Sequence, residues 1–159
     1  MRHLITLLLT INHLALYSQD SSLVGKVDLA QIKGIGGWEN MEKDFSAYQP
    51  ESEKITFLKA KEERIEGITI FLGTWCSDSQ EQLPKVFKVL QTAGLDKKVI
   101  LFGVNREKSE PKAEVDQFKV TKLPSVFVKL KTGAVVQILN EIPELNFETD
   151  FKNKILHIN

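Results

Sequence analysis

The sequence predicts a single α/β domain built on a mixed sheet. Two short apolar runs, ITIFLG at 68–73 and VILFGV at 99–104, are typical of strands buried on both faces. Two further runs, SVFVKL at 125–130 and AVVQIL at 134–139, flank a Lys-Thr-Gly turn and predict a hairpin. The 159 residues, 42% hydrophobic and 26% charged, are enough for one globular domain with its own core.

Helices are predicted where apolar residues recur at helical spacing between start and stop signals. The first such segment follows Pro50 and is highly charged, and the second ends before Gly94. Ser109 is the predicted cap of the third, with Pro111 tolerated in its first turn. The predicted helices are 51–66, 78–92, 109–118 and a final one that carries Phe147, Phe151 and Ile155 on one stripe.

The segment before residue 51 has weaker patterns. Alternation over 21–29 predicts a first strand, and the glycine- and aromatic-rich stretch at 33–50 predicts a long loop with one helical turn after Trp38. The glycines of this loop lack the spacing and the strand-to-helix turn of a phosphate-binding loop. We therefore expect an N-terminal extension at 19–50 and the α/β domain at 51–159.

The first 18 residues have the pattern of a secretory signal peptide. Arg2 precedes an apolar stretch from Leu4 to Leu16, and the small Ser18 precedes polar residues. The stretch is shorter than the roughly 20 apolar residues of a membrane-spanning helix, and a buried first element is the alternative interpretation. Processing near Ser18 predicts an exported protein, periplasmic or extracellular, with no membrane span.

Composition disfavours several classes of partner. Lys plus Arg and Asp plus Glu both number 21, so no overall charge attracts nucleic acid. Two of the three histidines, His3 and His13, lie in the apparent leader, which disfavours a histidine metal cluster. We expect neither a metal nor a cofactor. Cys76 is the only cysteine, and an unpaired thiol in an exported protein suggests intermolecular pairing or a reactive role.

Four motifs occur in order along the second half of the sequence. They are Trp75-Cys76 at the start of a predicted helix, Pro84 eight residues after the cysteine, Leu123-Pro124 before the hairpin and Gly133 in its turn. With this set the chain from about 67 to 158 resembles the thioredoxin-like family, and GTWCSDS is similar to a segment of exported bacterial members. The resemblance implies a three-layer fold with a central mixed sheet, helices on both faces and a cis-proline before the hairpin strand.

Cys76 is the expected reactive group. At a helix N-terminus it would face unpaired amide N–H groups and the positive end of the helix dipole, which together stabilise a thiolate. By the resemblance, a cis Pro124 leaves the backbone of Leu123 free to bind an extended peptide beside the sulfur. Trp75 would form one wall of that site, the alternative being an aromatic placed by packing alone.

Several positions depart from the family pattern. Ser79 stands where the second cysteine would be, so the chain alone cannot complete a net disulfide reduction, although the hydroxyl could donate to the Cys76 thiolate. The buried acid of the family aligns with Ile70, and its lysine partner aligns with Gly103. Both members of that proton-transfer pair are therefore missing.

Two charged residues are candidates for tuning the thiol. Asp78 replaces the proline that is common in the family, and its charge opposes the effect of the helix on the thiolate. Arg106 follows the second buried strand and could neutralise Asp78, the alternative being an ordinary exposed arginine.

Three functions remain open. Monothiol exchange or disulfide isomerisation through Cys76 would act on exported proteins or peptides, with an external thiol as reductant. A non-catalytic module would bind peptides beside Leu123-Pro124 without using the thiol. A thiol peroxidase or redox sensor is the least favoured, because neither a histidine nor a second cysteine lies near Cys76 in the sequence. We favour exchange, since it requires a single attacking thiolate.

Overall fold

The structure is a computed structural model that describes residues 22–156 and 158. The strands are β1 (Gly25–Val27), β2 (Ile65–Leu72), β3 (Val99–Gly103), β4 (Ser125–Leu130) and β5 (Val135–Asn140). The helices are α1 (Leu29–Lys33), α2 (Met41–Ala47), α3 (Ser52–Lys61), α4 (Ser77–Thr92), α5 (Lys112–Phe118) and α6 (Phe147–Leu156). Two 3₁₀ turns, η1 (Glu62–Arg64) and η2 (Asp96–Lys98), precede β2 and β3. The predicted leader at 1–18 lies outside the described residues.

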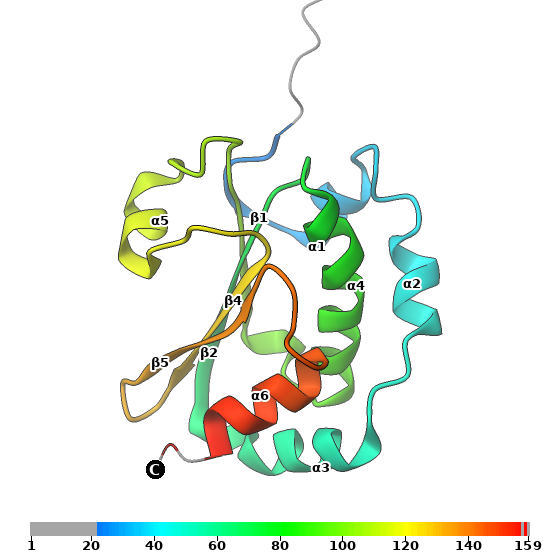
Figure 1. The fold of residues 1–159 in the computed structure, drawn as a ribbon, viewed down its shortest axis with the longest axis vertical. Coiled ribbons are helices and arrows are strands. Elements are labelled where there is room, and N and C mark those ends of the chain that lie inside the picture. Colours follow the sequence, from blue (N-terminus) through cyan, green and yellow to red (C-terminus); the bar gives the residue numbers. More distant parts are fainter. Residues whose placement is uncertain (1–21, 157, 159) are drawn as a thin grey trace, which may run out of the picture.

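The predicted α/β class with a mixed sheet is confirmed. The sheet has five strands in the order β1-β3-β2-β4-β5. The central pair β2 and β3 is parallel, whereas β1 pairs antiparallel with β3, and β4 lies antiparallel to both β2 and β5. Figure 1 shows α2 and α4 on one side of this sheet and α5 on the other. Two X-Pro peptide bonds, Glu110–Pro111 and Leu123–Pro124, are cis.

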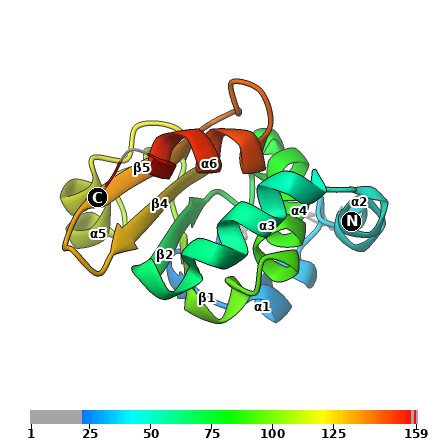
Figure 2. The ribbon, with the colours of Figure 1, turned by 90° about the horizontal axis from the view of Figure 1, so that it is seen from below.

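The residues of β2 alternate between two apolar clusters. Ile68, Ile70 and Leu72 belong to the main core, to which α4 and α6 contribute. Phe71 points to the other face and packs with Phe118 of α5 in a smaller cluster. Figure 2 shows α3, α4 and α6 gathered on the main-core side. Both faces are buried over the second half of β2, which accordingly ends in the apolar run Ile70–Leu72.

The N-terminal extension differs from the predicted long loop. Its strand is only β1, because Asp28 begins α1 with a capping box in which Asp28 and Gln31 bond each other's backbone N–H groups. The single predicted helical turn is the two-turn helix α2, which packs against α4. Ile32, Trp38 and Met41 are all buried in the main core. The extension is therefore part of the folded unit and supplies an edge strand.

Two predicted helix boundaries are wrong. The helix expected at 51–66 ends at Lys61, because Ile65 is needed in the main core and begins β2 after one 3₁₀ turn. Ser109 does not cap the third predicted helix, since the helix begins three residues later and the Ser109 hydroxyl oxygen accepts from the Asn105 amide instead. That helix starts at Lys112, with Pro111 as the residue before its first turn. No described helix is both long enough and apolar enough to cross a membrane.

Two buried acids on α6 hold neighbouring segments in place. Glu148, only 1% exposed, accepts from the Tyr48 hydroxyl at 2.9 Å and from the Glu51 N–H at 3.1 Å. Asp150 accepts from the N–H groups of Glu144 and Leu145, the first at 2.7 Å. Buried carboxylates are tolerated when their oxygens are hydrogen-bonded. Glu148 thereby fixes the link between α2 and α3, and Asp150 fixes the loop before α6.

Replacing Glu148 by glutamine should lower the free energy of unfolding by about 1.5–3 kcal/mol, because one carboxylate acceptor is exchanged for an amide donor that faces a donor. Urea unfolding at neutral pH measures the effect. Glu53→Gln is the matched control, since Glu53 is 74% exposed and its ion pair with Lys152 should be worth less than about 1 kcal/mol. Equal effects of the two substitutions would contradict the tethering role of Glu148.

Stability should also fall at alkaline pH through Tyr48. Burial, and then the hydrogen bond to Glu148, raise the pKa of the Tyr48 hydroxyl above its ordinary value of 10.0. The unfolded chain therefore ionises first as the pH rises, so the contribution of Tyr48 is complete below pH 10 and is lost above it. The difference in unfolding free energy between the wild type and Tyr48→Phe should narrow between pH 9 and pH 11.5. A difference that stays constant over this range would count against the raised pKa.

Candidate functional site

Cys76 lies at the junction of β2 and α4. It is the N-cap of this 16-residue helix, with extended backbone angles, and its carbonyl accepts from the Gln80 N–H at 3.1 Å. The residue is partly exposed, and its Sγ lies 3.7 Å from the Leu123 carbonyl oxygen. The first-turn N–H groups of α4 are unpaired within the helix and lie next to the cap. The structure thus places the sulfur near both these N–H groups and the Leu123 carbonyl oxygen.

A polar groove of about 410 Å³ lies beside the sulfur. Its lining residues are Trp75, Cys76, Ser77, Asp78, Arg106, Lys108, Thr121, Lys122, Leu123 and Glu141. Five predicted site residues are therefore brought together, namely Trp75, Cys76, Asp78, Arg106 and Leu123. Ser79 and Pro124 are fully or largely buried and are not part of the lining. Lys122 and Glu141 form an ion pair across 2.6 Å at the groove and were not predicted.

Ser79 has a structural role that the sequence did not reveal. Its side chain is fully buried, and its Oγ accepts from the Gly73 N–H at 3.2 Å. The proposed hydrogen bond from Ser79 to Cys76 is not among those found between the described residues. Ser79 therefore braces the loop that leads from β2 to the thiol by satisfying a buried backbone donor.

The Trp75 ring is held by a hydrogen bond and by a cation–π contact. Its indole Nε1 donates to the Val104 carbonyl at 3.0 Å, which ties the ring to the end of β3. The Arg106 guanidinium lies over the ring, 5.1 Å from the centroid, in a cation–π contact. Gly73 permits this arrangement, because a Cβ there would come within 2.8 Å of the ring. Arg106 thus stacks on the wall of the groove, and its position is set at least in part by Trp75.

The N-terminal extension clamps the strand that leads to Cys76. The carbonyl of Thr74 accepts from the Trp38 indole at 2.9 Å and from the Gln80 amide at 3.0 Å. Gly37 is required beside this contact, because its φ is +92° and a Cβ would lie 2.5 Å from Nε2 of Gln80. The only signal for this clamp in the sequence is the position of Trp38, directly after the glycine-rich stretch.

Ile70 and Gly103, which the resemblance aligns with a proton-transfer pair, both lie at positions closed to ionisable side chains. Ile70 is fully buried in the main core. Gly103 lies under the extension, where a Cβ would come within 2.2 Å of the Leu23 carbonyl oxygen. A lysine at position 103 would therefore collide with the backbone that enters β1. Among the described residues no group of three His, Cys, Asp or Glu side chains could hold a metal ion.

Ser79→Ala should lower the free energy of unfolding by about 1–3 kcal/mol, because the buried Gly73 N–H loses its acceptor. Ser77→Ala is the matched control: Ser77 is exposed in the same helical turn and should change stability by less than about 0.5 kcal/mol. The measurement is denaturant unfolding, paired with the rate at which iodoacetamide alkylates Cys76. Unchanged stability with a changed alkylation rate would instead assign Ser79 to the thiol.

No family model, curated protein or solved structure matches this chain. What the site can do is therefore inferred from its residues and their geometry.

Proposed function

We propose that this protein is an exported, monothiol member of the thioredoxin-like family that performs thiol–disulfide exchange through Cys76. The observation that carries the proposal is the partly exposed sulfur at the N-cap of α4, beside a groove of about 410 Å³. In the finer description, the fold is a three-layer thioredoxin-like fold with a cis-proline before the hairpin strand. The strand order and the helices seen on the two sides of the sheet support this description.

The reaction needs one sulfur on the protein and two external partners. The Cys76 thiolate attacks one sulfur of a substrate disulfide, forms a mixed disulfide and releases the other substrate sulfur as a thiolate. A second thiolate, from an external thiol or from the substrate itself, then attacks the mixed disulfide and releases Cys76. Attack by an external thiol leaves that thiol disulfide-bonded to the substrate, and a second equivalent of the thiol then frees the substrate sulfur and completes the reduction as an external disulfide. Attack by a thiol of the substrate itself gives isomerisation. Ser79 takes no part in either step.

The backbone before Pro124 supports a peptide as the substrate. The carbonyl of Leu123 lies against the Cys76 Sγ, and the N–H of Leu123 donates to no other group in the described part of the chain. An extended peptide could pair with this residue and bring its disulfide to the sulfur, in the manner of strand addition. Without exchange, the same contact would give the binding module that is the second candidate function.

The export part of the proposal rests on residues 1–18 and on the lone cysteine. Substrates with disulfides occur in oxidising compartments, and the leader pattern would deliver the protein to one. An external thiol reductant is then required, because the chain holds no second cysteine to resolve the mixed disulfide.

Cys76 should accelerate the reshuffling of a scrambled disulfide protein in the presence of reduced glutathione. Intact-mass analysis should detect a mixed disulfide at one site per chain, because a single thiolate attacks. Cys76→Ser should abolish both signals. The double variant Cys76→Ser/Ser77→Cys carries its only thiol one residue later, at an exposed position. It should recover less than a tenth of the wild-type reshuffling rate, because the sulfur is no longer on the N-cap residue.

The outcomes separate the candidate functions. Equal reshuffling by the wild type and by Cys76→Ser would exclude exchange. If Cys76→Ser reshuffles as fast as the wild type and also still binds peptides, the groove is a non-catalytic peptide-binding site. Equal rates for the displaced thiol and for Cys76 would show that any exposed thiol suffices and that the site contributes nothing.

A further inference from the structure

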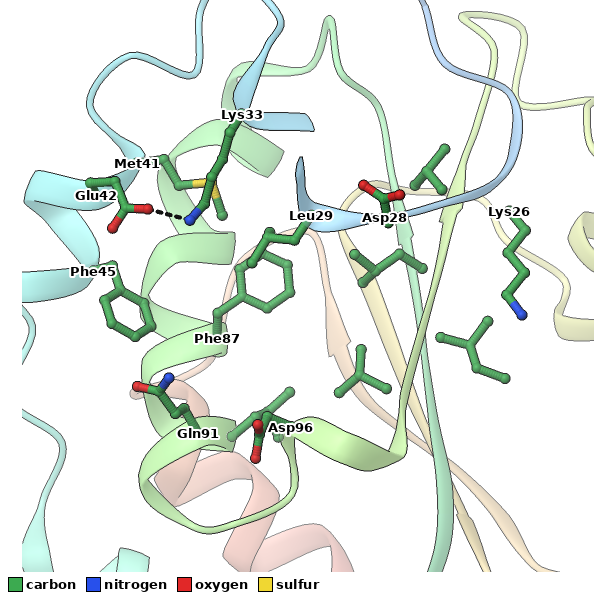
Figure 3. Close-up of a pocket in the computed structure, with 15 residues that line it drawn as sticks. Lys26, Asp28, Leu29, Lys33, Met41, Glu42, Phe45, Phe87, Gln91 and Asp96 are labelled. Carbon is green, nitrogen blue, oxygen red and sulfur yellow. Dashed lines mark hydrogen bonds and ion pairs between the residues drawn. The ribbon is translucent and has the colours of Figure 1, made fainter. Parts of the chain in front are cut away.

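A second hollow lies on the other side of α4, away from the thiol groove. Its volume is about 580 Å³, and its walls come from the β1–α1 segment, α2, α4 and the start of β3. Figure 3 shows Leu29, Phe45 and Phe87 around one side of this space, with Gln91 and Asp96 at its lower end. Volumes of 300–1,000 Å³ are usual for small-molecule sites.

The wall of the hollow is apolar and is built by the extension. Leu29 of α1 and Phe45 of α2 are partly exposed and pack against the main core. Phe87 and Leu90 of α4 and Leu101 of β3 complete the wall and are 9% exposed or less. The ion pair between Lys33 and Glu42 joins α1 to α2 at one end of the hollow, as drawn in Figure 3. An apolar molecule here would cover the exposed parts of Leu29 and Phe45.

The lower end of the hollow carries a negative charge without a partner. Gln91 and Asp96 are exposed, and neither side chain bonds to any other described residue. The other acids of the lining already have partners, since Asp28 caps α1 and Glu42 forms an ion pair with Lys33. Lys26 also borders the hollow, but it sits opposite Phe102 and shares the second face of the sheet. Among the acids of the lining, Asp96 is therefore the one without a partner in the described part of the chain, while the ammonium of Lys88 lies over the Phe45 ring, 4.9 Å from its centroid.

An extended peptide cannot add to the sheet at this place. The short β1 already covers β3 from Leu101 to Gly103. At the next position toward the hollow, the Val99 N–H is taken by the Asp96 carbonyl in the 3₁₀ turn. Strand addition requires free N–H and C=O groups in alternation, and this edge does not offer them.

From these observations we propose that the hollow binds a small apolar molecule that carries an ammonium group. The ring or chain of the ligand packs against Leu29, Phe45 and Phe87, and the ammonium pairs with the Asp96 carboxylate and donates a hydrogen bond to the Gln91 amide oxygen. This site is independent of Cys76 and of the proposed exchange reaction.

Three probes with one common ring test the proposal: tryptamine, 3-methylindole and indole-3-acetate. Calorimetry and protein-detected NMR on the full chain measure affinity and location. Tryptamine should bind saturably, 3-methylindole more weakly and indole-3-acetate weakest. Asp96→Asn should weaken tryptamine two- to five-fold, which is what an exposed ion pair supplies, and leave 3-methylindole unchanged. Asp116→Asn is the matched control, because Asp116 is exposed on α5, away from the hollow. It should change the affinity of neither tryptamine nor 3-methylindole.

Leu29→Trp, which fills the hollow from α1, should abolish binding of all three probes while the alkylation rate of Cys76 reports that the fold is kept. Saturable shifts at residues outside the hollow would overturn the proposal, as would equal affinities for the three probes or an unchanged tryptamine affinity in Asp96→Asn. A dimer in solution that Leu29→Trp dissociates would assign the hollow to a second copy of the chain and would also overturn it.

Discussion

The position of the thiol depends on one buried carbonyl, that of Thr74. Thr74 is 2% exposed, so its carbonyl must find donors within the protein. It finds two, one from Trp38 in the extension and one from Gln80 in the first turns of α4. A carbonyl held by both segments fixes the direction in which the chain leaves β2, and Cys76 follows two residues later. The N-terminal extension is therefore a structural part of the site although it contributes no residue to the groove.

Glycines make this clamp sterically possible. Gly37 lets the extension turn against Gln80, and Gly103 lets the backbone at Leu23 cross the end of β3. A Cβ at position 103 would lie 2.2 Å from the backbone oxygen of Leu23, and Gly37 has a φ of +92°, which residues with a side chain rarely adopt. Position 103 therefore has no room for a side chain while the backbone of Leu23 crosses it.

The sequence predicted the sheet better than it predicted the extension. β2 to β5 each contain an apolar run that stands out in the sequence, and α4 carries its pattern over four turns. β1, α1 and α2 are short, and their stability comes from tertiary contacts of Ile32, Trp38 and Met41 that no local pattern encodes. The site shows the same division. Motif spacing placed Trp75 and Cys76 at one groove, whereas the buried role of Ser79 depends on a backbone donor six residues earlier in the chain.

The charges that act on Cys76 come from the surface of the protein. Ile70 and the backbone above Gly103 leave no ionisable side chain behind the sulfur at those two positions. Asp78, Arg106 and the Lys122–Glu141 pair all line the groove, which is open to water. Exposed charges interact through a high effective dielectric and are screened by salt, so each alters the thiol less than a buried partner would. Two backbone groups are the fixed electrostatic influences on the sulfur: the N–H groups at the start of α4, which the clamp at Thr74 holds in place, and the Leu123 carbonyl oxygen, 3.7 Å from Sγ. They act in opposite directions, because the first favours a negative charge on the sulfur and the second opposes it.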